Sequence, residues 1–111
     1  MLQVTDKIIA EMAQAVVDEV EPERIILFGS RAEGKGGADS DIDLLVIVSE
    51  PFGAGRSRRR ESARIWKALS RFDIAKDILL YSADEIAQWR DSLNHVVARA
   101  LREGLTVYER S

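Results

Sequence analysis

The sequence predicts an α+β (α/β) fold in which helices pack on a small mixed β-sheet of about four strands. Two patterns predict it: short runs rich in β-branched and aromatic residues, and longer segments whose apolar residues recur at helical spacing. These segments follow the order α-β-β-α-β-α-α-β, which is typical of a sheet with helices on its faces. The length of 111 residues suits one domain, so residues 1–111 are expected to form a single unit.

The first half of the chain is expected to hold a helix and two strands. Thr5 or Asp6 can cap a helix that ends near Val20, and Pro22 then breaks the helical pattern. Residues 24–28 form the first strand, residues 29–39 a loop, and residues 41–48 the second strand. Because the second strand is nearly all apolar after Asp43, we expect both of its faces to be covered.

The second half is expected to begin with a flexible connection over residues 49–57. A basic helix then buries Ala63, Ile65, Trp66 and Leu69, and a capping box from Ser82 to Glu85 starts a later helix. The predicted ranges are 58–71 for the basic helix, 75–81 for a strand, 82–90 and 94–102 for two helices, and 105–108 for the last strand. Gly104 is expected to stop the helix before it.

Composition excludes several classes of function. The chain has no cysteine, so disulfides, thiolate metal sites and cysteine nucleophiles are excluded. The longest apolar runs fall short of the roughly 20 residues of a membrane span, and the first residues lack a signal-peptide pattern, so the cytoplasm is the expected location. The net charge of −3 gives no general attraction to nucleic acid. The basic cluster at Arg56–Arg60 is either a solvated helix start or a contact for an acidic partner, a triphosphate or RNA.

The most informative stretch is residues 29–46, where a glycine-rich loop leads into Asp41 and Asp43. Side chains two positions apart on a strand share a face, so the two carboxylates are expected to point the same way. Two close like charges are costly unless a cation lies between them. The pair therefore predicts a divalent metal, and the stretch as a whole predicts a nucleotide site.

Three other interpretations of this stretch are open. Gly29 to Gly36 nearly matches a P-loop, although Gly36 stands where the magnesium-binding Ser or Thr belongs. Asp39, Asp41 and Asp43 have the spacing of a calcium loop, although Leu44 replaces the glycine that its sharp turn needs. The aspartates can also be ordinary turn and strand-edge residues.

Gly29-Ser30, ten intervening residues and then Asp41-Ile42-Asp43 resemble the nucleotidyltransferase superfamily that includes DNA polymerase beta. The short chain and the Gly-Ser-Arg-Ala of residues 29–32 resemble its minimal nucleotidyltransferase (MNT) group. The resemblance implies that Asp41 and Asp43 hold magnesium and that Gly29 and Ser30 contact the triphosphate, with Arg31 as a further phosphate contact.

The same resemblance implies a third carboxylate, for which Asp77 fits better than Asp73 because apolar strand residues follow it. Asp77 would complete the metal site and accept a proton from the attacking hydroxyl. The implied reaction transfers a nucleoside monophosphate, AMP from ATP, and releases pyrophosphate.

MNT proteins are typically paired with a helical HEPN protein, so the resemblance also implies an antitoxin that modifies a HEPN toxin. Glu33 departs from the family by replacing a basic residue, and no second domain is present to recognise an acceptor, so a partner or self-association is expected to supply it. The alternatives are a non-catalytic nucleotide-binding or toxin-neutralising module and a P-loop hydrolase that depends on Lys35.

Overall fold

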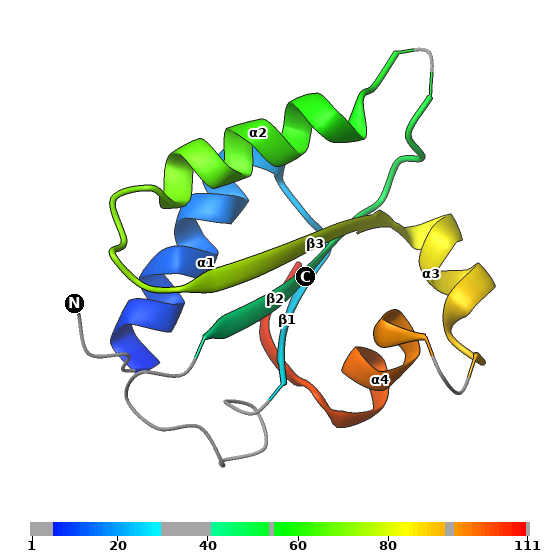
Figure 1. Cartoon of the computed structure of the whole chain (residues 1–111). Helices are drawn as coiled ribbons and strands as arrows, with labels where there is room; N and C mark the ends of the chain where they lie inside the picture. The colour runs from blue at the N-terminus through cyan, green and yellow to red at the C-terminus, as the bar shows by residue number, and fades with distance from the viewer. Residues whose placement is uncertain (1–5, 30–40, 54, 93–94, 111) are drawn as a thin grey trace.

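The computed structural model describes residues 6–29, 41–53, 55–92 and 95–110. Its elements are α1 (Asp6–Val20), β1 (Arg24–Phe28), β2 (Ile42–Val48), α2 (Arg58–Leu69), β3 (Lys76–Ser82), α3 (Ala83–Trp89), α4 (Val96–Glu103) and β4 (Leu105–Glu109). Their order and the mixed sheet confirm the predicted α+β fold (Figure 1). Within these residues, no helix is long and apolar enough to cross a membrane.

The sheet has the strand order β3-β2-β1-β4. β2 lies at its centre, antiparallel to β1 and parallel to β3, and β4 pairs antiparallel with β1 at one edge. The parallel pair needs a crossover connection, and α2 supplies it. As a result the end of β1 and the starts of β2 and β3 lie side by side at one end of the sheet.

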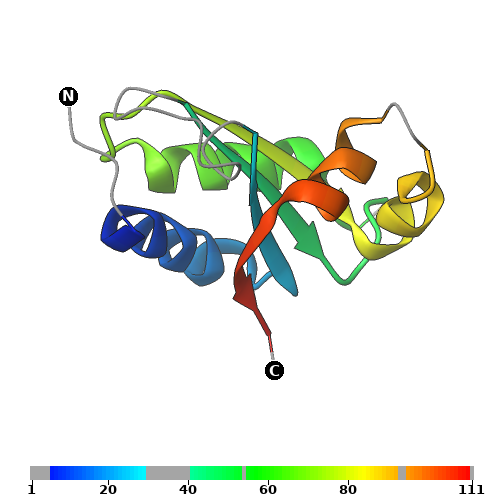
Figure 2. The same cartoon turned by 90° about the horizontal axis from the view of Figure 1, so that it is seen from below.

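Helices cover both faces of the sheet (Figure 2). One core packs α1 and α2 against Ile25, Leu27 and the even-numbered residues of β2. A smaller core packs Val97 and Ala100 of α4 against Ile26, Leu45 and Ile47 on the opposite face. The two-sided burial of β2 confirms the expectation from its apolar run.

Two residues expected in the core of α2 are exposed, so that part of the prediction is wrong. Trp66 is 41% exposed and Ala63 is also exposed, whereas the buried stripe consists of Glu61, Ile65 and Leu69. These three residues recur every four positions, so they lie on one face of the helix. Trp66 lies about 100° round the helix from Ile65, and its ring meets the Lys76 ammonium, 5.9 Å from the centroid.

The predicted capping box is present, because the Glu85 carboxylate accepts a hydrogen bond from the Ser82 amide at 3.0 Å. Gly104 ends α4 as expected, but its backbone is extended (φ −82°, ψ 167°) rather than left-handed. A Cβ there would lie 2.4 Å from Ile26 Cγ2 and 2.5 Å from the Ala100 carbonyl oxygen. The glycine therefore serves a close approach of the helix end to β1, and not a left-handed cap.

Candidate active site

Asp43 occupies the centre of the sheet end where three strands meet. In the antiparallel pair it lies opposite Phe28 of β1, and in the parallel pair its register partner is Asp77 of β3. Figure 1 shows this end of β3 far from α3, which follows the other end of the strand. Residues 41 and 77, which are 36 positions apart in the sequence, are thereby brought to the same end of the sheet.

The Asp43 side chain lies directly against Gly29, the residue that follows β1. A Cβ on Gly29 would lie 2.4 Å from Asp43 Oδ2, and the backbone of Gly29 is left-handed with φ 82°. Both facts require glycine, because a side chain would be strained there and would displace the carboxylate. The family resemblance implied a close backbone approach of Gly29 to a triphosphate, but no pattern in the sequence indicated this contact with Asp43.

The carboxylates of Asp41, Asp43 and Asp77 interact electrostatically at this end of the sheet. Burial raises the pKa of the half-buried Asp43 carboxyl above its ordinary value, and the charges of Asp77 and then Asp41 raise it further. Asp41 and Asp77 are exposed, so Asp43 is the member that loses most hydration. Such a group is stabilised in its ionised form by a bound cation.

Asp77, and not Asp73, is the aspartate that lies beside Asp43 on the neighbouring strand. Asp77 pairs directly with Asp43 in the sheet, and its charge contributes to the raised pKa of that carboxyl. Asp73 lies in the turn between α2 and β3, and its charge is not among the causes of that shift. The structure therefore brings Asp41, Asp43 and Asp77 to the same end of the sheet, and their role as a metal site stays a prediction.

The donor set fits a hard divalent cation. Asp41, Asp43 and Asp77 offer only carboxylate oxygens, which magnesium prefers. A divalent ion would compensate the repulsion between their negative charges. Within the part of the chain that the structure describes, no three acidic, histidine or cysteine side chains already form a ligand set. The carboxylates are therefore gathered by the fold, while their side chains are not arranged around one point.

The remaining predicted contacts lie outside the described residues. Ser30 and Arg31 belong to this group, as do Glu33 and Lys35 of the P-loop interpretation. The calcium-loop interpretation is wrong, because Leu44 is fully buried inside β2 where a sharp turn would be needed. The third interpretation took Asp43 as an incidental strand-edge carboxylate, but Asp43 lies on β2, which is paired on both sides.

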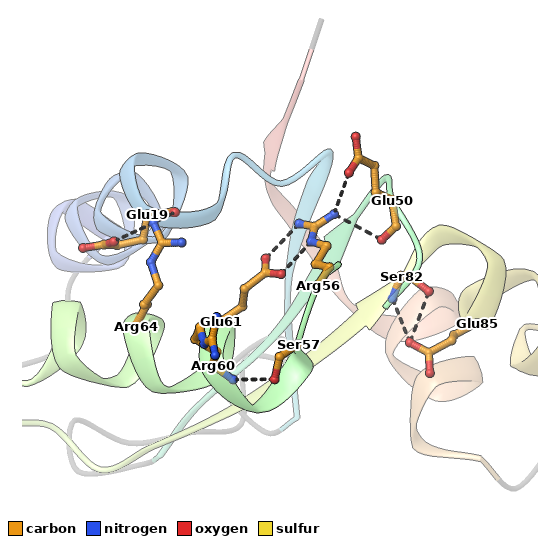
Figure 3. Close-up of polar contacts among 9 residues, drawn as sticks. All are labelled: Glu19, Glu50, Arg56, Ser57, Arg60, Glu61, Arg64, Ser82 and Glu85. Carbon is orange, nitrogen blue, oxygen red and sulfur yellow. Dashed lines mark hydrogen bonds and ion pairs between the residues drawn. The ribbon is translucent and has the colours of Figure 1, made fainter. Parts of the chain in front are cut away.

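Two arginines of the basic cluster, Arg56 and Arg58, are paired with acidic residues of the chain, and Figure 3 shows the contacts of Arg56. The guanidinium of Arg56 donates two hydrogen bonds to the Glu61 carboxylate, from Nε at 2.6 Å and from Nη2 at 2.8 Å. Its Nη1 also forms an ion pair with Glu50. Arg58 pairs with Glu85, and Arg64 donates to the Glu19 carbonyl at 2.6 Å. These contacts favour a structural role over a phosphate or RNA contact for the two arginines Arg56 and Arg58.

Comparison with known proteins identifies one domain family. The family model described as "Nucleotidyltransferase domain" matches residues 9–101. A Methanocaldococcus jannaschii protein named "Putative protein adenylyltransferase MJ0141" is 38% identical over 58 residues, which are 52% of this chain and 54% of that protein. The alignment thus spans about half of that relative's length.

Three solved structures share the fold. A variant of the MntA-HpeT toxin-antitoxin has a TM-score of 0.60 at 17% identity, over 98% of this chain and 76% of that one. A toxin-antitoxin crystal structure with AMP-PNP has a TM-score of 0.57 at 18% identity, over 92% and 74% of the two chains. A "putative nucleotidyltransferase" from Sulfolobus solfataricus has a TM-score of 0.52 at 21% identity, over 99% and 93%. At these identities the likeness supports the fold alone.

Proposed function

Because the chain belongs to the nucleotidyltransferase domain family, we propose that Asp41, Asp43 and Asp77 are its metal-binding and catalytic carboxylates. The observation that carries this proposal is the strand register that pairs Asp43 with Asp77 beside Gly29. A pair of bound magnesium ions would neutralise the phosphates and the pyrophosphate leaving group. Gly29, Ser30 and Arg31 are proposed to contact the triphosphate.

In the proposed reaction an acceptor hydroxyl attacks the α-phosphorus of a nucleoside triphosphate. A new bond forms between that oxygen and phosphorus, the bond to the β-phosphate oxygen breaks, and pyrophosphate leaves. The hydroxyl proton passes to the Asp77 carboxylate. This carboxylate is exposed at the end of the sheet, so an acceptor molecule can approach it. Asp43, half-buried against Gly29, is the most buried of the three carboxylates and is proposed to fix the position of the site.

We further propose that ATP is the donor and a protein the acceptor, with AMP transferred to a helical HEPN-like partner whose toxicity the chain controls. The name of the M. jannaschii relative supports protein adenylylation. A structure with the same fold is a toxin-antitoxin crystallised with AMP-PNP, which makes ATP and a toxin the donor and the acceptor to test first. The location that matches this proposal is the cytoplasm.

The test is label transfer from α-labelled ATP with magnesium and the partner encoded beside the gene. Asp77→Asn is expected to lower the rate by about 10²- to 10⁴-fold, the usual contribution of a general base. Asp73→Asn is the matched control, since it makes the same change four positions away outside the carboxylate group, and it is expected to retain the wild-type rate. Equal losses in the two variants would overturn the assignment of Asp77.

A double variant of the other two carboxylates separates catalysis from simple binding. If Asp41→Asn, Asp43→Asn protein still neutralises the partner at equal concentration, the chain acts as a non-catalytic interaction module. Loss of neutralisation together with loss of label transfer supports the enzyme.

A further inference from the structure

The sheet ends in two edge strands, β4 and β3, and only one of them is irregular. β4 has five residues, and a bulge at Ile25 and Ile26 interrupts its pairing with β1. β3 has seven residues, contains no proline and keeps an uninterrupted register with β2. Native sheets protect their edges with short strands, bulges and prolines, so a long and regular edge such as that of β3 is a site for pairing with a further strand.

The backbone of β3 shows which groups are available at this edge. The Ala75 carbonyl oxygen accepts a hydrogen bond from the Ile42 amide of β2 at 3.0 Å. Every second residue of a strand directs its N–H and C=O groups to the same side, so Asp77 and Leu79 also face β2. The residues that direct these groups outward, where no described strand pairs with them, are Lys76, Ile78 and Leu80. Each of the three offers one donor and one acceptor to an added strand.

Side chains of α2, which runs alongside β3, mark the two ends of this edge (Figure 1). At the start of the strand, the half-exposed ring of Trp66 lies 5.9 Å from Lys76 Nζ. At the far end, Arg58 lies over the ring of Tyr81 at 5.5 Å. Because Tyr81 packs with the core on the opposite face of the sheet from α2, Arg58 crosses the edge at this point. Between the two points β3 is apolar and only partly covered.

The same strand carries Asp77, the proposed catalytic base, so a segment that pairs with β3 is brought to the proposed site. Asp77 directs its backbone groups to β2. An antiparallel segment would therefore place the residue opposite Asp77 in a non-hydrogen-bonded pair, with the Cα atoms about 4.5 Å apart. Side chains in such pairs touch, and long side chains also reach diagonal positions. A serine or threonine directly opposite, or a tyrosine on the diagonal, would bring its hydroxyl to the carboxylate.

We propose that an extended segment of the acceptor protein pairs with the outer edge of β3 as a further antiparallel strand and presents its hydroxyl residue to Asp77. This proposal rests on the proposed function as a protein-modifying enzyme, and it names how the acceptor is held. Arg59 is exposed and lies seven positions before Trp66, so both side chains are on the same side of α2. The segment is therefore expected to carry an acidic side chain where it passes Arg59.

Amide hydrogen exchange of the full chain, followed residue by residue by NMR, tests the pairing. The probe is the protein encoded beside the gene, added at saturating concentration without ATP. Binding is expected to slow exchange by about 10-fold or more at Lys76, Ile78 and Leu80. Exchange at Asp77 and Leu79 should change less, because their amides already face β2. Overlapping synthetic peptides of the same protein then identify the segment that produces this alternating pattern.

Ile78→Pro is the variant that closes the edge. Proline removes an outward donor and its ring obstructs an added strand, while the hydrogen bonds to β2 remain. Ile78→Ala is the matched control, because it loses the isoleucine packing but keeps the N–H. Affinity for the partner protein should fall by about 10-fold or more in Ile78→Pro and stay near wild type in Ile78→Ala. If the proline variant fails to fold, the exchange pattern of the wild-type chain decides the question.

The charge of the segment is tested with Arg59→Glu, which is expected to weaken binding of the partner protein most at low ionic strength. Arg99→Glu makes the same change on the exposed side of α4, away from β3, and should bind as wild type does. Equal losses in the two variants would show that the segment does not pass Arg59 and would overturn the placement of the added strand between Trp66 and Arg58.

The proposal is overturned if the partner protein leaves exchange at Lys76, Ile78 and Leu80 unchanged, or if Ile78→Pro and Ile78→Ala bind it equally. It is also overturned if these amides become protected in the chain alone as its concentration rises, because a second copy then occupies the edge. Exchange and affinity are measured without ATP. Absence of label transfer in a chain whose edge is protected by the partner would therefore count against the enzyme and not against the docking edge.

Discussion

At the scale of single residues, the contact between Gly29 and Asp43 defines the candidate site. The glycine adopts φ 82° and leaves room for Oδ2, which a Cβ would approach to 2.4 Å. Phe28, the residue before it, is the register neighbour of Asp43, so backbone pairing holds the two strands in place around this contact. A side chain at position 29 would therefore displace the Asp43 carboxylate.

Gly29→Ala is expected to retain the fold and lose the activity. The left-handed backbone costs a non-glycine residue about 1–2 kcal/mol, and the new methyl group displaces the Asp43 carboxylate. Urea unfolding measures the first effect and label transfer the second. Gly53→Ala is the control, since a Cβ there meets nothing within 4 Å, and it should change neither quantity.

Asp43→Asn is expected to stabilise the metal-free protein at neutral pH. The pKa of Asp43 is raised in the folded state, so the folded protein binds its proton more tightly than the unfolded chain does. Its contribution to stability is therefore fully present below the ordinary aspartate pKa of about 3.9 and is lost as the pH rises through the raised value. The advantage of the variant should grow over that same rise.

Unfolding free energies of wild type and Asp43→Asn, measured with EDTA from acid to neutral pH, check this prediction. Taking the difference between the two proteins cancels the titration of all other groups that the substitution leaves unchanged. A difference that stays constant with pH would contradict the raised pKa of Asp43.

At the scale of elements, local patterns predicted which segments form helices and strands, but not which side of a helix is buried. Strand and helix periodicity come from neighbouring residues, so β1, β2 and α1 appear close to their expected bounds. In α2 two apolar stripes compete, and the packing of the helix against α1 and the sheet selects Ile65 and Leu69. Trp66 is left outside because tertiary packing decides between the stripes.

The start of α2 depends on Arg56, which reaches the buried Glu61 across one helical turn. Glu61 is 8% exposed, and the two hydrogen bonds from Arg56 compensate its lost hydration. Arg56→Ala would leave this carboxylate buried without its partner, so it is expected to destabilise the fold by about 1–3 kcal/mol. The arginine side chain is itself 22% exposed, which keeps the loss below that of a fully buried pair.

Denaturant unfolding of Arg56→Ala measures this cost, with Arg59→Ala as the control at an exposed position of the same helix. The Arg59 variant is expected to stay within about 0.5 kcal/mol of wild type. If the two variants lost equal stability, the cluster would act as a general basic surface and not through the Arg56–Glu61 pair.

At the scale of the whole molecule, the site depends on strand pairing that no local pattern contains. The spacing of Asp41 and Asp43 predicted a shared face, and the resemblance to a known family indicated Asp77. That Asp77 lies beside Asp43 follows from the parallel pairing of β3 with β2, which α2 makes possible. The contact with Gly29 follows in turn from the antiparallel pairing of β1 with β2.

This arrangement predicts that magnesium and ATP stabilise the whole fold through Asp43. A ligand that binds only the native state raises the unfolding free energy by about 2.7 kcal/mol at a hundred times its dissociation constant. Wild type with magnesium and ATP is expected to gain stability of this order, and Asp43→Asn to gain much less.

Arg56→Ala is the control: it starts from a lower stability but should keep the full gain, because the contacts of Arg56 with Glu50 and Glu61 include none of the three aspartates. Thermal or urea unfolding with and without the ligands measures all three, and an equal gain in Asp43→Asn would place the nucleotide away from the carboxylates.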